Sequence, residues 1–166
     1  MTVLAAHGVA LDLPAGWDGR IRRRSTVEAA QRHAVSGPPP APPMVAQAAT
    51  FSLPAKVGDF GGGAVELMRA PDLFLAIVEY DSDSVGTALF RRLGVPRRLR
   101  AESFHPQALQ RTLPGQGGIQ VFFTEAERAF CLYVVLGSYP RRGRTVPLVN
   151  RLLDGIRVDG RVPAQR

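Results

Sequence analysis

The chain of 166 residues contains one cysteine, Cys131, and no long hydrophobic run. A lone cysteine excludes an internal disulfide and any zinc or iron–sulfur site built from several thiolates, and it is typical of a reducing compartment. Nowhere do about 18 uncharged apolar residues follow one another, so we expect no membrane-spanning helix. The first residues lack a basic leader ahead of an apolar stretch, so we expect no secretion signal. These absences predict a cytoplasmic protein without membrane contact.

Acidic residues and lysine are also scarce. The chain has 14 Asp and Glu residues and 21 Lys and Arg residues, which gives a net charge of +7, and Lys56 is its only lysine. Positive charge attracts polyanions and acidic proteins, and arginine pairs with carboxylates and phosphates through its planar group. A GC-rich genome also produces an arginine excess, so composition alone does not establish a function. The clusters are Arg20–Arg24 and the candidate partner-binding residues Arg91, Arg92, Arg97, Arg98, Arg100, Arg141, Arg142 and Arg144.

The apolar pattern predicts one α+β domain, an antiparallel β-sheet packed by helices. With 45% hydrophobic and 21% charged residues, the chain has the composition of a globular protein. Helical spacing predicts a helix over Val146–Asp154, and capping residues near Asp83 with Gly94 and Pro96 predict another over 83–94. The expected strands are 8–13, 20–24, 44–53, 64–68, 73–80, 119–124, 130–136 and 156–158, with hairpins pairing 64–68 with 73–80 and 119–124 with 130–136.

Proline and glycine mark the limits of this domain. Residues 36–43 include five prolines, each of which removes a hydrogen-bond donor and fixes φ, so this stretch is expected to be a Pro-rich loop. Residues 160–166 carry no packing signal and are expected to form a flexible C-terminal tail. The predicted domain is therefore 1–159.

The order of elements resembles the Mog1/PsbP-like superfamily. The likeness is carried by the opening strand with the Leu-Pro-Ala-Gly-Trp turn at 13–17, a middle helix, a late hairpin, and the closing elements from Val135 to Ile156. It covers most of the chain and implies an α/β/α sandwich. Members of that superfamily are mostly non-enzymatic, so the resemblance implies a binding or adaptor protein. The chain lacks the lipobox cysteine of the lipoprotein branch, and its Pro-rich insertion after Arg24 is longer than the pattern.

No residue pattern carries a recognisable reaction. His7, His33 and His105 lie far apart without acidic neighbours at metal-ligand spacing, and Cys131 lies in an apolar strand, where a thiol is unreactive. We therefore expect no catalytic residue, no metal and no cofactor.

Two loop-like motifs have plain structural interpretations. Gly61–Gly63 is followed neither by a phosphate-binding lysine nor by a helix, so a turn is expected there. Glu79, Asp81 and Asp83 lack the spacing of a calcium loop, and Asp83 is expected to cap a helix.

The sequence thus predicts a non-catalytic protein-binding adaptor, a chaperone or a subunit of a larger assembly, with another, acidic protein as its partner. The alternative is a nucleic-acid-binding protein acting through the arginine clusters, although no helix-turn-helix, zinc-finger or RNA-recognition motif accompanies them. Trp17, Phe60 and Phe104 lie beside turns and are either core residues or interface anchors, with Trp17 expected in the core. The oligomeric state stays open.

Overall fold

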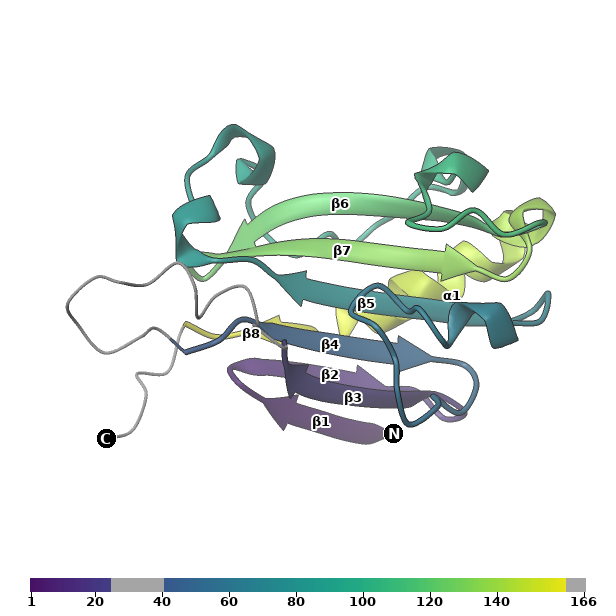
Figure 1. Cartoon of the computed structure of the whole chain (residues 1–166), viewed down its shortest axis with the longest axis horizontal. Coiled ribbons are helices and arrows are strands. Elements are labelled where there is room, and N and C mark those ends of the chain that lie inside the picture. The colour runs from purple at the N-terminus through teal and green to yellow at the C-terminus, as the bar shows by residue number, and fades with distance from the viewer. Residues whose placement is uncertain (25–40, 161–166) are drawn as a thin grey trace.

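The fold combines two antiparallel sheets with one α-helix in the computed structural model, which describes residues 1–24 and 41–160 (Figure 1). The larger sheet has five strands in the order β3-β4-β5-β7-β6, and the smaller sheet has three in the order β1-β2-β8. The predicted α+β class is confirmed. The elements are β1 (Thr2–Ala6), β2 (Val9–Leu13), β3 (Asp18–Arg23), β4 (Met44–Ala49), β5 (Leu73–Glu79), β6 (Gly117–Glu125), β7 (Arg128–Leu136), α1 (Arg142–Asp154) and β8 (Ile156–Val158).

The larger sheet buries side chains on both faces, and every residue of β5 and β7 is buried. On one face, Leu75 and Ile77 pack in a core with α1 and the smaller sheet. On the other face, Phe74 and Val78 pack in a second core with residues of the irregular segment 51–68. The continuous apolar run of β5 is therefore explained by its central position between two cores, as its sequence predicts.

Two-residue turns close the β1–β2 and β6–β7 hairpins. Ala126 and Glu127 adopt φ of 51° and 60° between β6 and β7, and His7 and Gly8 adopt φ of 54° and 76° between β1 and β2. Such positive φ angles match the twist of antiparallel strands. The β6–β7 hairpin confirms the prediction, whereas β1 was not predicted.

The helix predicted at 146–154 is confirmed and begins earlier, at Arg142. Val149, Leu152 and Leu153 are fully buried against the sheet, as their spacing indicates. Pro147 lies inside the helix rather than in its first turn, on an exposed face. Gly155 ends the helix and β8 follows, both as predicted.

The helix predicted over 83–94 is wrong. Residues Ser82–Ser84 and Ala88–Phe90 form two short 3-10 turns, and Gly86 between them has φ of 85°, which interrupts any helix. The N-cap position of the first turn is Asp81, whose side chain makes no capping hydrogen bond, and Asp83 lies inside the turn, so its predicted capping role is wrong. Among the described residues, α1 is the only α-helix, and it covers one face of the larger sheet.

The strand predicted over 64–68 is also wrong. Residues Val65–Leu67 form a 3-10 turn, so β5 pairs with β4 and β7 instead of forming a hairpin with this segment. Gly61 and Gly63, with φ of 87° and 91°, bend the chain so that Val65 packs onto the second core. The prediction of a turn at Gly61–Gly63 is confirmed.

Most of the Pro-rich loop at 36–43 and residues 161–166 of the predicted tail lie outside the described residues. At the described end of the loop, Pro43 accepts a hydrogen bond from the Arg24 amide at 2.7 Å and Pro42 accepts one from Arg23 Nη1 at 2.6 Å. These contacts extend the pairing of β3 with β4 beyond the end of both strands.

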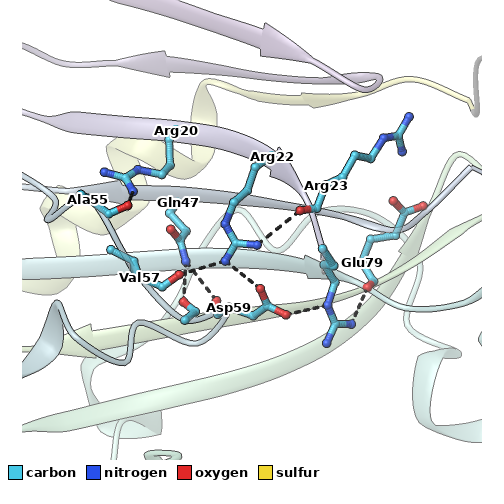
Figure 2. Close-up of polar contacts among 10 residues, drawn as sticks. Arg20, Arg22, Arg23, Gln47, Ala55, Val57, Asp59 and Glu79 are labelled. Atoms are coloured by element: carbon cyan, nitrogen blue, oxygen red, sulfur yellow. Dashed lines mark hydrogen bonds and ion pairs between the residues drawn. The ribbon is translucent and has the colours of Figure 1, made fainter. Parts of the chain in front are cut away.

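The arginines of β3, together with Arg24 just after it, hold the segment 53–59 against the sheet (Figure 2). Arg20 donates to the carbonyls of Pro54 and Ala55 at 2.7 and 3.1 Å. Arg22 donates to the Val57 carbonyl at 3.0 Å and to Asp59 Oδ1 at 2.8 Å, while Arg24 Nε donates to Asp59 Oδ2 at 2.8 Å. The strand predicted at 20–24 does lie at a sheet edge, but these side chains bind loop acceptors instead of standing free in solvent.

Asp59 is expected to stabilise the protein at neutral pH. Burial alone would raise the pKa of its carboxyl, but hydrogen bonds from Arg24 and Arg22 and their charges outweigh burial, so the pKa lies below its ordinary value. A group with a lowered folded-state pKa contributes stability above its unfolded-state pKa and loses it as the pH falls through the folded-state pKa. Asp59→Asn should therefore cost about 1–2 kcal/mol at pH 7, and less at pH 2.5.

Urea unfolding of both proteins at the two pH values measures this difference. The exposed Asp81, which has no ion pair within the described chain, supplies the control Asp81→Asn, for which no change is expected. An Asp59→Asn cost that is equal at pH 7 and pH 2.5 would contradict the role of the ionised carboxylate.

Candidate partner-binding surface

The arginines at 97–100 are engaged within the fold. Arg97 Nη1 donates to the carbonyls of Leu153 and Ile156, the latter at 2.8 Å. Arg98 Nη1 lies 2.7 Å from Asp154 Oδ1. These contacts place two cations at the C-terminal end of α1, where they complement its dipole. Arg100 pairs at 3.6 Å with Glu102, and both side chains are largely exposed.

The arginines at 141–144 lie at the other end of α1, about 18 Å away along a helix of 13 residues. Arg142 stacks over the Tyr139 ring, 4.2 Å from its centroid, and donates to the Tyr139 carbonyl at 3.1 Å. Arg141 and Arg144 are exposed and have no acceptor in the part of the chain that the structure describes. This pair and the 97–100 group therefore form separate sites.

The arginine clusters do not converge on one site. The β3 arginines lie at one edge of the five-stranded sheet, and Arg91 and Arg92 follow a turn beside β6 at the opposite edge. Four strand spacings separate these edges by about 19 Å. Each cluster must therefore be considered as a local site.

Arg91 and Arg92 differ from the other arginine clusters because exposed leucines flank them in the sequence. Leu89 is 58% and Leu93 82% exposed, and both arginines are exposed without an acceptor among the described residues. We call these four side chains, Leu89, Arg91, Arg92 and Leu93, the 89–93 surface. It combines apolar area with unpaired positive charge.

The fold holds the 89–93 surface in place from below. Phe90, 4% exposed, packs its ring 5.2 Å from that of Tyr80 and 5.5 Å from that of Phe122. On the β6 side, the Thr124 amide donates to the Arg92 carbonyl and the Gly94 amide donates to the Thr124 carbonyl, each at 2.8 Å. Because Phe90 points into the core, the adjacent Leu89 points outward, and the hydrogen bonds to Thr124 fix the chain at Arg92 and Gly94 around the exposed Leu93.

The three aromatic candidates do not belong to this surface. Phe104 is buried in the first core, 1% exposed. Trp17 is half-buried against the same core, in agreement with its predicted core position. Phe60 packs edge-on against Tyr133 with ring centroids 5.4 Å apart. Leu89 and Leu93 were missed as exposed residues because their helical spacing indicated a buried helix face.

A cavity of about 280 Å³ lies over the second face of the larger sheet. Phe60, Val65 and Tyr133 are among its lining residues, and an ion pair of 3.3 Å joins Arg111 to Glu66, which also line it. The Tyr133 hydroxyl accepts a hydrogen bond from the Gln110 amide at 2.8 Å. The cavity is smaller than most ligand pockets, and the Arg111, Glu66 and Tyr133 side chains in its lining already bind acceptors or donors of the fold.

The residues considered for catalysis are dispersed or engaged. Among residues 1–24 and 41–160, no three His, Cys, Asp or Glu side chains are grouped so that they could hold a metal ion. His105 Nδ1 accepts a hydrogen bond from the Gln107 amide at 3.0 Å, and Glu79 forms a buried ion pair with Arg128 at 3.0 Å. No described helix has the length and hydrophobicity to cross a membrane.

Cys131 should be unreactive in the native protein. It is fully buried, and burial raises the pKa of its thiol to about 12. At pH 8 only roughly one thiol in 10,000 would be ionised, and the thiolate is the reactive form. We expect Ellman's reagent to label the folded protein far more slowly than the protein in concentrated urea. Labelling at equal rates in both conditions would contradict the buried position.

Comparison with known proteins adds no relative to this picture, since no protein-family model, no curated protein and no solved structure matches the chain.

Proposed function

We propose that this chain is a non-catalytic protein-binding adaptor, a chaperone or a subunit of a larger assembly, which holds an acidic partner protein at the 89–93 surface. One observation carries the proposal: the exposed side chains of Leu89 and Leu93 flank Arg91 and Arg92 in the sequence, and neither arginine side chain has an acceptor within the described chain. Protein interfaces are enriched in arginine and bury apolar side chains around it.

The chemistry of the surface specifies its partner. Two unpaired guanidinium groups favour carboxylates, with which arginine forms two parallel hydrogen bonds. The leucines favour an apolar side chain between or beside those carboxylates. An acidic segment with hydrophobic residues therefore fits the 89–93 surface better than a uniformly charged polymer.

Nucleic acid receives less support from the same arrangement. A nucleic-acid interface usually draws on many phosphate contacts along one basic surface. Here the clusters are separated by about 18–19 Å along α1 and across the sheet, and Arg97, Arg98 and Arg142 already bind acceptors of the fold. Nucleic-acid binding is kept as the competing outcome of the experiment.

We further propose that the chain is a distant Mog1/PsbP-like protein that acts in the cytoplasm. An antiparallel sheet, a late hairpin and a closing helix support this family, while a second helical layer is absent from the described residues. The single buried cysteine is compatible with a reducing compartment.

The test is affinity capture from a lysate of the source organism, with the native chain and three variants as bait. Arg91→Ser/Arg92→Ser should lower recovery of the partner at least about tenfold, and Leu89→Ser/Leu93→Ser should do the same. Arg141→Ser/Arg144→Ser is the matched control, because it also removes two exposed, unpaired arginines. It should capture the partner as well as the native chain does.

Nuclease treatment separates the two classes of partner. Capture of a stoichiometric protein that survives nuclease and depends on the 89–93 surface would support the proposal. Nuclease-sensitive capture that falls equally with both arginine pairs, and steeply with salt, would replace it with nucleic-acid binding.

A further inference from the structure

The outer edge of β6 carries a short row of unpaired backbone groups next to the 89–93 surface. Gly118 exchanges two hydrogen bonds with His105, at 2.9 and 3.0 Å, on the side of β6 that faces away from β7. Thr124 bonds outward in the same way to Arg92 and Gly94. Backbone groups alternate along a strand, so those of Gln120 and Phe122 also point outward.

The outward backbone groups of Gln120 and Phe122 have no hydrogen-bond partner within the described residues. The chain leaves the edge after Gly94 and returns at His105, and between them Val95, Leu99 and Phe104 pack into the first core. In Figure 1 the segments that precede β6 rise above its left end and its right half, and no ribbon is drawn above its middle. Two amides and two carbonyls, those of Gln120 and Phe122, are therefore left open between two braced ends. An edge of this kind is a template for another strand.

The side chains around the opening are apolar and partly exposed. Ile119 and Val121 pack against the first core while remaining half-buried. On the opposite face, Phe122 packs 5.5 Å from Phe90, the anchor of the 89–93 surface. An added strand would thus place alternate side chains on apolar surface and one end beside two free arginines.

We infer that an extended, acidic segment of the partner protein pairs with β6 at Gln120 and Phe122 and continues onto the 89–93 surface. This inference rests on the proposed function and names the form in which the partner binds. The opening between Gly118 and Thr124 spans about 20 Å of strand, which admits about three residues of an added strand and four backbone hydrogen bonds. Four hydrogen bonds alone would hold the segment weakly, so binding also requires the charged and apolar contacts of the 89–93 surface.

A second copy of this chain is a poorer occupant. Pairing two β6 strands about Val121 would bring the braced ends at His105 and Gly94 of each copy against the other. Each copy also carries a net charge of +7, and like charges oppose association. Charge complementarity selects an acidic segment.

The test titrates 15N-labelled protein with a capped heptapeptide of alternating glutamate and valine. We expect the amide signals of Gln120 and Phe122 to shift and their hydrogen exchange to slow. The same peptide N-methylated at every backbone amide, and a lysine–valine peptide, should each bind at least about tenfold more weakly, because the first loses its backbone donors on both edges and the second reverses the charge. Unchanged Gln120 and Phe122 signals at millimolar glutamate–valine peptide would overturn the inference.

A protein variant gives a second, independent readout. Gln120→Pro deletes an amide that faces away from β7, so it leaves the β6–β7 ladder intact. Gln120→Ala is its control, since both variants lose the side-chain hydrogen bond to the Ala108 carbonyl. In the capture experiment, Gln120→Pro should lose the partner and Gln120→Ala should keep it. If Gln120→Pro, shown by its melting curve to be folded, keeps a partner that Arg91→Ser/Arg92→Ser loses, the strand pairing is refuted and the proposed function stands.

Discussion

Replacing Arg128 with methionine is expected to destabilise the protein by about 3–5 kcal/mol. The Arg128 side chain is 2% exposed, and its Nε and Nη2 atoms each lie 3.0 Å from a carboxylate oxygen of Glu79. It also donates to the carbonyls of His7 and Asp159, both at 3.0 Å. One guanidinium thus ties the larger sheet to the β1–β2 turn and to the end of β8. Methionine replaces the aliphatic volume but leaves the buried Glu79 carboxylate without this counter-charge.

Urea unfolding followed by the fluorescence of Trp17, the only tryptophan, measures the effect. Arg98→Met is the matched control, because the Arg98–Asp154 pair is of similar length, 2.7 Å, but 68% and 50% exposed. Exposed pairs contribute about 0–1 kcal/mol, so the control should remain close to the native chain. A loss of less than about 1 kcal/mol for Arg128→Met would contradict the assigned role.

Gly137→Ala is the second large effect, with an expected loss of about 1–3 kcal/mol. A Cβ atom at this position would collide with the carbonyl oxygen of Arg69 and lie 3.1 Å from that of Asp72. The Gly137 amide also donates to the Asp72 carbonyl at 2.9 Å, and the Asp72 carboxylate receives the Arg69 amide at 2.7 Å. The methyl group must therefore displace a hydrogen-bonded turn at the start of β5.

Gly143→Ala supplies a control of opposite sign. Gly143 lies in α1, and beyond its own helical turns no atom of the described chain comes within 4 Å of the position that a Cβ would take, so alanine fits there without a collision. Because alanine favours the helix over glycine, this substitution should leave stability unchanged or raise it by up to about 1 kcal/mol. Thermal unfolding of both variants tests the pair, and equal melting temperatures would contradict the packing at Gly137.

Short-range signals predicted most of the strands. β5 and β7 are continuous apolar runs, as expected for strands buried on both faces, and the periodic apolar residues of α1 all face the core. The prediction missed β1, although His7-Gly8 permits the two-residue turn that pairs it with β2. It failed at 83–94 because Val85, Leu89 and Leu93 have helical spacing there, while Gly86 and the hydrogen bonds to Thr124 impose another path.

The same failure concealed the candidate site. Their helical spacing predicts a buried face for Leu89 and Leu93, whereas the structure exposes both residues near Arg91 and Arg92 in the chain. Sequence alone could not show that Arg97 and Arg98 bind acceptors of the fold. These acceptors, Leu153, Ile156 and Asp154, follow more than 50 residues later. Only tertiary contacts distinguish an arginine that supports the fold from one that is available to a partner.

Photo-crosslinking in the cells of the source organism tests the central claim most directly. Leu93 is replaced with the photoreactive p-benzoylphenylalanine, and Leu148, an exposed leucine on α1, is replaced in a parallel strain. The account predicts one protein adduct from position 93 that disappears with Arg91→Ser/Arg92→Ser, and no such adduct from position 148. The same adducts from both positions, or an adduct at 93 that survives loss of both arginines, would contradict a partner site on the 89–93 surface.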